Sequence, residues 1–98
     1  MRLSPDQVRC VRQTLDTILP GAEVWVFGSR ATGRSRPFSD LDLLLIWPKS
    51  LSWAQRAALR DAFDESDLPF RVDVVEATAL SPAIAQRVDS EKVPLRAD

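Results

Sequence analysis

The feature that most constrains this chain is a pair of short apolar segments joined by a basic loop. The first segment, 23–27, runs directly into Gly28-Ser29, and Asp40-Leu41-Asp42 leads into the second segment, 41–47. Continuous apolar runs of this length, bounded by turn residues, are typical of strands that are buried on both faces. The two segments therefore predict central strands of a sheet, and the loop between them carries the polar chemistry.

The residues at the two ends of this loop suit a phosphate and a divalent cation. Gly28 has no Cβ, so its backbone can approach a phosphate closely. Ser29 adds a hydroxyl and stands where a short helical turn can begin, with free N–H groups aimed at an anion. Asp40 and Asp42 are two residues apart and project from one face of a strand. Their carboxylates suit Mg²⁺, which takes oxygen ligands and bridges to substrate phosphates.

The rest of the chain alternates between helical and strand patterns. Serine followed by proline, or by glutamine three residues later, predicts helix starts near residues 4, 52 and 81. We expect helices over 5–19, 52–66 and 81–90, and a third strand over 70–76. This order predicts an α/β domain spanning residues 1–98, with a small mixed sheet of three to four strands and helices packed on one side.

Composition excludes several classes of function. A length of 98 residues predicts one domain, and a net charge of −1 argues against direct binding of nucleic acid. No apolar run approaches the ~20 residues of a membrane span, and no apolar stretch follows residues 1–6 as in a signal peptide. The single cysteine, Cys10, excludes an internal disulfide and favours the cytoplasm. The chain has no histidine, so a general base must be a carboxylate, a lysine or the substrate itself.

The spacing of the loop residues resembles the signature of a known superfamily. Gly28-Ser29 followed, after ten residues, by Asp40-x-Asp42 is similar to the motif of the polymerase β-like nucleotidyltransferases. The small size makes the chain resemble the minimal nucleotidyltransferases, or MNT proteins. The resemblance implies the nucleotidyltransferase fold, with Gly28 and Ser29 holding the β- and γ-phosphates of ATP. Arg30, Arg34 and Arg36 line the same loop. They are either solvated loop charges or contacts to the triphosphate or a partner, with Arg30 nearest the phosphates.

The same resemblance implies a site for two Mg²⁺ ions, held by carboxylates that also act in catalysis. Asp40 and Asp42 are the expected ligands, and Asp73 is the natural match for the acidic residue that the family carries on a later strand. Asp73 is also the expected proton acceptor for the incoming hydroxyl. Two alternatives stay open: Glu76 is a weaker match at the exit of the strand, and Asp73 is otherwise a strand-end residue that is hydrated or paired with Arg71.

A cluster of three carboxylates is costly without a cation. Two like charges ~5 Å apart repel by roughly 3 kcal/mol at an effective dielectric constant of about 20, whereas a whole domain is stable by about 5–15 kcal/mol. Asp73 also lies between Val72 and Val74, where an uncompensated carboxylate is unfavourable. We therefore expect a metal ion to convert this repulsion into coordination.

Resemblance to the MNT proteins implies an antitoxin that transfers AMP from ATP to a hydroxyl, expected to be a tyrosine, of a partner HEPN-type ribonuclease toxin. The chain itself has no tyrosine, which is compatible with modification of another protein. The alternative is a non-catalytic antitoxin that neutralises the toxin by forming a complex with it. Transfer to a small molecule, as in aminoglycoside-modifying relatives, is a third reading, disfavoured because we expect no second domain to enclose a pocket. Both homo- and hetero-oligomers stay open.

Overall fold

The computed structural model describes residues 3–34, 36 and 38–95. The strands expected at 23–27 and 41–47 are confirmed over their full lengths, whereas the third strand begins at Val72 rather than at Phe70. The elements in chain order are α1 (Pro5–Ile18), β1 (Glu23–Phe27), α2 (Ser29–Thr32), β2 (Leu41–Trp47), α3 (Trp53–Asp64), β3 (Val72–Glu76), the 3₁₀ turn η1 (Ala77–Ala79), α4 (Pro82–Glu91) and β4 (Val93–Pro94).

The expected helix starts are confirmed by their hydrogen bonds. At the start of α1, the Ser4 hydroxyl accepts from the Gln7 N–H at 3.1 Å, and the Gln7 side chain accepts from the Ser4 N–H at 3.0 Å. Ser52 and Gln55 form the same reciprocal pair at α3. Each pair satisfies two N–H groups that a helix leaves without internal partners, which explains why both helices begin where the serine stands.

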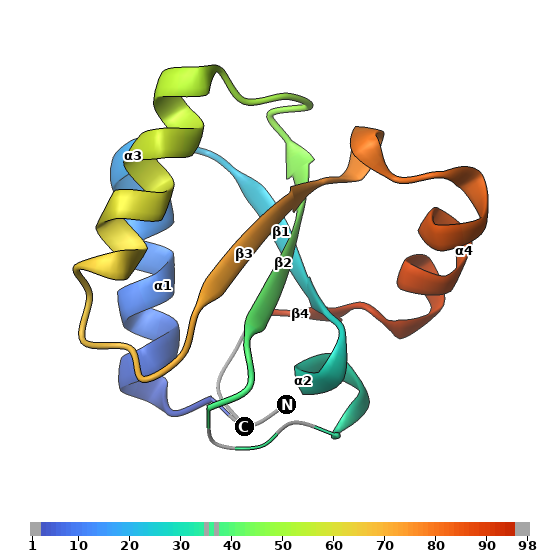
Figure 1. Ribbon diagram of the computed structural model, residues 1–98, viewed down its shortest axis with the longest axis horizontal. Coiled ribbons are helices and arrows are strands. Elements are labelled where there is room, and N and C mark those ends of the chain that lie inside the picture. The colour runs from blue at the N-terminus through green and yellow to red at the C-terminus, as the bar shows by residue number, and fades with distance from the viewer. Residues whose placement is uncertain (1–2, 35, 37, 96–98) are drawn as a thin grey trace.

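A mixed sheet of four strands forms the centre of the molecule (Figure 1), in the order β3-β2-β1-β4. β1 pairs antiparallel with β2 and with β4, and β2 pairs parallel with β3. The two strands that are apolar on both faces, β1 and β2, are therefore the central ones, as expected. The short strand β4 was not predicted, because two residues cannot show an alternating pattern.

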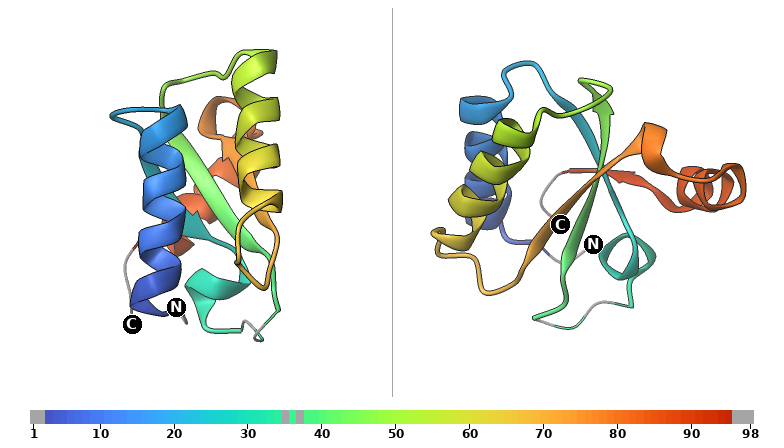
Figure 2. Two further views of the ribbon diagram at one scale, coloured as in Figure 1. Left: turned by 90° about the vertical axis from the view of Figure 1, so that its left-hand side faces the viewer. Right: turned by 45° about the horizontal axis from the view of Figure 1, so that its top comes forward.

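Helices α1 and α3 lie side by side on one face of the sheet (Figures 1 and 2), as the sequence predicts. Helices on the other face of the sheet were not expected, but α2 and α4 lie on the side opposite α1 and α3 (Figure 1). The apolar core fills the space between the sheet and the α1–α3 layer, and its fully buried members include Val11, Leu15, Leu41, Leu43 and Leu45. None of the helices in the described ranges has the length and apolar character that a membrane-spanning segment needs.

The alternation of β2 decides where its acidic residue goes. Leu41, Leu43 and Leu45 join the core cluster beside α1 and α3. Because successive side chains of a strand point to opposite faces, Asp42 projects from the other face, toward the side where α2 lies. The fold thus separates an apolar face of the central strands from a face that carries charge.

Candidate active site

The candidate site is a row of residues that crosses three neighbouring strands. Phe27, the last residue of β1, stands opposite Asp42 in the antiparallel pair. Asp42 in turn stands beside Asp73 in the parallel pair of β2 and β3. Residues in register on adjacent strands project from the same face of the sheet. The two carboxylates predicted from different parts of the chain therefore lie next to each other.

Gly28 closes this row at the exit of β1, where its backbone lies against the carboxylate of Asp42. Its φ of +76° and ψ of −154° belong to a region that only glycine adopts readily. A Cβ built at this position would stand 2.4 Å from Oδ2 of Asp42, which is closer than two non-bonded atoms can approach. Gly28 is thus required twice, for its backbone conformation and for its contact with Asp42.

The Asp42 carboxyl is half-buried and surrounded by negative charge. Burial raises the pKa of Asp42 above its ordinary value, and the negative charges of Asp73 and then of Asp40 raise it further. All three effects disfavour the ionised form. A group of this kind is stabilised as a carboxylate when a cation binds beside it.

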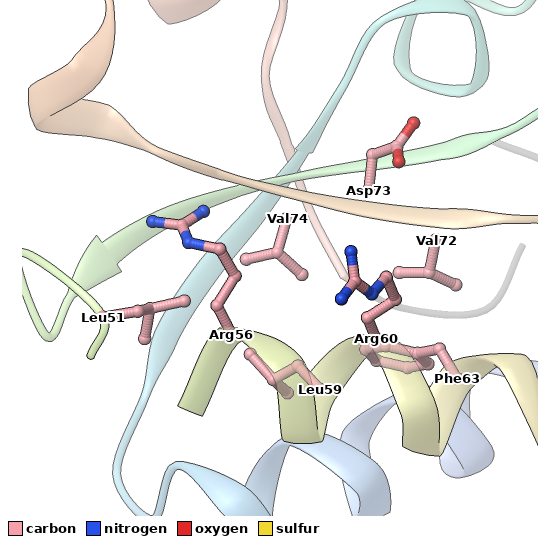
Figure 3. Close-up of a pocket in the computed structure, with 8 residues that line it drawn as sticks. All are labelled: Leu51, Arg56, Leu59, Arg60, Phe63, Val72, Asp73 and Val74. Atoms are coloured by element: carbon pink, nitrogen blue, oxygen red, sulfur yellow. The ribbon is translucent and has the colours of Figure 1, made fainter. Parts of the chain in front are cut away.

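The two faces of β3 carry acids with different partners. Figure 3 shows Asp73 projecting from the strand away from Val72 and Val74, whose side chains point toward α3. Glu76 shares the alternation of Val72 and Val74. Its side chain is only 11% exposed, and its carboxylate pairs with Arg56 of α3. Glu76 therefore lies on the face opposite Asp73, which removes it as an alternative member of the carboxylate cluster.

Asp73 also has the neighbour expected if it is a strand-end residue paired with Arg71. Nη2 of Arg71 donates a hydrogen bond to Oδ1 of Asp73 at 3.3 Å. The Arg71 side chain is 76% exposed, and exposed ion pairs contribute little free energy. Asp73 is thus both paired with Arg71 and adjacent to Asp42, and the two predicted arrangements coexist.

Asp40 lies just before β2 and is exposed, and it acts on Asp42 through its charge. Within the described residues, no three His, Cys, Asp or Glu side chains are arranged to hold one metal ion among themselves. The protein therefore presents a pair of adjacent carboxylates, Asp42 and Asp73, with a third acid nearby, rather than a closed cage of protein ligands.

Ser29 begins α2, the single helical turn that follows the row. Gly28 is the N-cap of this turn and offers no side-chain acceptor to its first N–H groups, while its own carbonyl accepts from Ala31 and Thr32, each at 3.1 Å. The turn ends at Gly33. Its start thus lies directly beside the contact between Gly28 and Asp42.

Arg30 is not where the sequence suggests. It was expected as the loop arginine nearest a bound nucleotide, but its side chain is only 2% exposed and is turned into the protein. Its guanidinium donates to the carbonyl oxygen of Ser39 and lies over the ring of Phe70. Arg34 and Arg36, the other arginines of the loop, are exposed.

The sequence contains no pattern that predicts the partners of Arg30. A backbone carbonyl such as that of Ser39 exists at every position, and Phe70 reads as an ordinary apolar residue at the start of a strand. A basic residue in a glycine-containing loop suits a phosphate as well as it suits an internal partner. Only the burial of the Arg30 side chain in the structure distinguishes an internal contact from a contact with phosphate.

Comparison with known proteins is consistent with this geometry. Residues 8–95 match the model of the nucleotidyltransferase domain family. A candidate protein adenylyltransferase of Haemophilus influenzae, MntA, is 39% identical over 74 residues, which cover 76% of this chain and 65% of that protein. The chain thus spans just under two thirds of the length of this relative.

Solved structures show the same fold. A candidate minimal nucleotidyltransferase matches with a TM-score of 0.70 and 34% identity, over 95% of this chain and 97% of the other. A toxin–antitoxin structure with AMP-PNP matches with a TM-score of 0.72 and 23% identity, over 93% of this chain and 73% of the other.

Proposed function

Because the chain belongs to the nucleotidyltransferase domain family, we propose that it transfers AMP from ATP to a hydroxyl of a partner protein. Its relative MntA is a candidate protein adenylyltransferase, and MntA and HepT form a toxin–antitoxin pair in a solved structure of similar fold. The proposed partner is accordingly a HEPN-type toxin, the proposed acceptor is a tyrosine, and the protein is its antitoxin. A cytoplasmic location stays a prediction.

The observation that carries this proposal is the pair of Asp42 and Asp73 side by side on one face of the sheet, with the backbone of Gly28 against the Asp42 carboxylate. A protein that only masks its partner has no use for two adjacent carboxylates that repel each other. Nor does it require a glycine whose missing Cβ makes room for one of them. The row is costly for folding and useful for a metal–nucleotide complex.

The donor set fits Mg²⁺. The ion prefers oxygen ligands and is usually bound by one or two carboxylates together with waters and substrate phosphates, not by a cage of protein ligands. Asp42 and Asp73, with Asp40 nearby, offer such a partial set, which agrees with a site that ATP completes. When bound, Mg²⁺ supplies charge neutralisation for the triphosphate and makes the acceptor hydroxyl easier to ionise.

Each residue of the site then has a role that follows from its position. Asp40 and Asp42 would hold the Mg²⁺ ions, and the backbone at Gly28 and Ser29 would hold the β- and γ-phosphates through N–H groups at the start of α2. Asp73, on the edge strand β3, accepts the proton of the acceptor hydroxyl. The hydroxyl oxygen forms a bond to the α-phosphorus, and the bond from that phosphorus to the bridging oxygen of pyrophosphate breaks.

The weak ion pair between Arg71 and Asp73 is compatible with this role. Both side chains are more than one third exposed, so water screens their attraction. A metal ion or a proton can therefore compete with Arg71 for the Asp73 carboxylate. The same pair keeps a cation beside Asp73 when no metal is bound.

The test uses ATP labelled at its α-phosphate, Mg²⁺ and a purified HepT-type toxin, with wild-type protein, Asp42→Asn and Glu76→Gln. Glu76→Gln is the matched control, because it changes an acid on the opposite face. We expect the toxin to become labelled by wild type and by Glu76→Gln but not by Asp42→Asn, and mass spectrometry to locate AMP on a tyrosine. An unlabelled toxin that all three proteins neutralise as a stable complex would instead establish a masking antitoxin.

A further inference from the structure

Arg30 is the one charged residue that the described part of the chain buries completely. It belongs to α2, directly after the residues proposed to hold phosphate. Burial lowers the pKa of its guanidinium below the ordinary value. A charged group in such a place is retained only where specific partners compensate it.

Two of its contacts join segments that are distant in the chain. Nε and Nη2 donate to the carbonyl oxygen of Ser39 at 3.1 and 2.9 Å. The carbon at the centre of the guanidinium lies 4.2 Å from the centre of the Phe70 ring. Ser39 immediately precedes Asp40, and Phe70 lies at the entrance to the strand that carries Asp73.

A backbone hydrogen bond links the same two segments. The N–H of Leu41 donates to the carbonyl oxygen of Arg71 at 2.8 Å, just ahead of the paired region of β2 and β3. The two Arg30 contacts lie next to this hydrogen bond: Ser39 is in one of the two segments that the bond joins, and Phe70 is in the other. The guanidinium thus connects α2, the approach to β2 and the approach to β3.

From these contacts we propose that Arg30 is a positioning residue, which holds the segment carrying Asp40 and the start of β3 in place against α2. It acts through the Ser39 carbonyl and the Phe70 ring and does not touch the nucleotide. The link to metal binding rests on the proposed function above. The proposal that Arg30 holds this segment in place does not depend on the proposed function.

Lysine cannot replace this residue. Two donors of one planar group point at a single carbonyl oxygen while the central carbon of that group lies over a ring, and an ammonium group has neither the fork nor the plane. Arg30→Lys therefore keeps the charge and loses the geometry. Phe70→Leu loses the ring but keeps an apolar side chain of similar volume, so it weakens the same contact from the other side.

The experiment compares wild type with Arg30→Lys, Phe70→Leu and Arg87→Lys, all as the full chain without nucleotide. Arg87→Lys is the matched control, because Arg87 is an exposed arginine of α4. Hydrogen exchange is followed in the peptide 38–41, and Mn²⁺ binding is measured by calorimetry. Thermal unfolding shows that each variant is folded at the temperature used.

We expect faster exchange of 38–41 in Arg30→Lys and Phe70→Leu but not in Arg87→Lys. We also expect the Kd for Mn²⁺ to rise by about 10-fold, the lower end of the cost of losing a group that orients metal ligands. Folded variants with a lower Tm but unchanged exchange of 38–41 would show that Arg30 only fills space, and would overturn the inference. If Arg30→Lys does not fold, Phe70→Leu decides in the same way.

The two proposals fail separately. Wild-type protein that binds no Mn²⁺ would contradict the metal site of the proposed function. In that case the exchange of 38–41 alone decides whether Arg30 holds the segment. Normal Mn²⁺ binding by wild type and by both variants, with unchanged exchange, would contradict the role of Arg30 and leave the proposed function intact.

Discussion

The two faces of β2 and β3 contrast sharply although they are built from alternate residues of the same strands. Leu43 points into the core between the sheet and the helices α1 and α3, where it is fully buried. Asp42, its neighbour in the chain, points to the other face and stands beside Asp73. One face gains free energy by excluding water, and the other gathers like charges that oppose folding.

Residues that stabilise the fold and residues proposed to act in catalysis thus alternate along the same five paired positions of β2 and β3. The apolar face stabilises the fold without any ligand, whereas under the proposed function the acidic face serves to bind a cation and an anion. Residues on the two faces are expected to respond oppositely to substitution. The following predictions test that division, beginning with the largest effect.

The largest effect concerns the two acids of β3, which lie on opposite faces. Asp73→Asn should lower the rate of AMP transfer by about 10²–10⁴-fold, the usual contribution of a general base. Glu76→Gln should leave the rate close to that of wild type, because Glu76 pairs with Arg56 near α3. Equal losses of activity in both variants, at equal stability, would break the division between the faces.

On the apolar face, Leu43→Ala should lower the free energy of unfolding by about 3 kcal/mol, as expected for a large core side chain cut to alanine. Leu43 is fully buried and contributes to the main cluster. Denaturant unfolding measures the loss. The folded fraction of this variant should still be stabilised by Mg-ATP, and loss of that stabilisation would mean that the faces are coupled.

Gly28→Ala tests the contact between the loop and the acidic face, with Gly21→Ala as its matched control. Both glycines have a positive φ, but an added Cβ meets Asp42 at Gly28 and nothing within 4 Å at Gly21. We expect Gly28→Ala to cost about 2 kcal/mol of stability and to abolish stabilisation by Mg-ATP. Gly21→Ala should cost about 1 kcal/mol and keep the Mg-ATP response. Identical behaviour of the two variants would contradict the close approach.

The smallest predicted effect is a pH dependence. The pKa of Asp42 is raised in the folded protein, so the folded state binds this proton more tightly than the unfolded chain, whose Asp pKa is about 3.9. The contribution of Asp42 to stability is therefore greatest below that value and is lost as the pH rises through the folded pKa. Metal-free Asp42→Asn should gain in Tm over wild type as the pH is raised from about 4. A Tm difference between the two proteins that does not change with pH would show that the ionisation of Asp42 is not its cause.

Much of the fold follows from local patterns that need no tertiary information. The serine caps of α1 and α3 and the full extents of β1 and β2 were predictable because each depends on residues within one element. The cluster of Asp42 and Asp73 was a weaker prediction, since it depends on which strands pair and in which register. Here the resemblance to a family added what spacing alone does not contain.

Arg30 and Glu76 show where sequence reasoning stops. Glu76 is excluded from the site by strand alternation, once the strand is known to continue from Val72 to Glu76. Arg30 lies in α2, a single helical turn that is too short for periodicity to tell whether a side chain turns inward. Its burial depends on a carbonyl and a ring supplied by distant segments, and neither has a pattern of its own.

The most direct test of the central claim is the thermal unfolding of wild type and Asp42→Asn at neutral pH, with EDTA and then with Mg-ATP. We predict that the metal-free variant melts a few degrees above metal-free wild type, since about 1 kcal/mol shifts Tm by roughly 4–8 °C in a domain of this size. Mg-ATP should then stabilise only the wild type, by about 2.7 kcal/mol at 100 times its Kd. A metal-free variant that melts at or below wild type, or one that gains as much from Mg-ATP, would contradict a carboxylate site that trades stability for nucleotide binding.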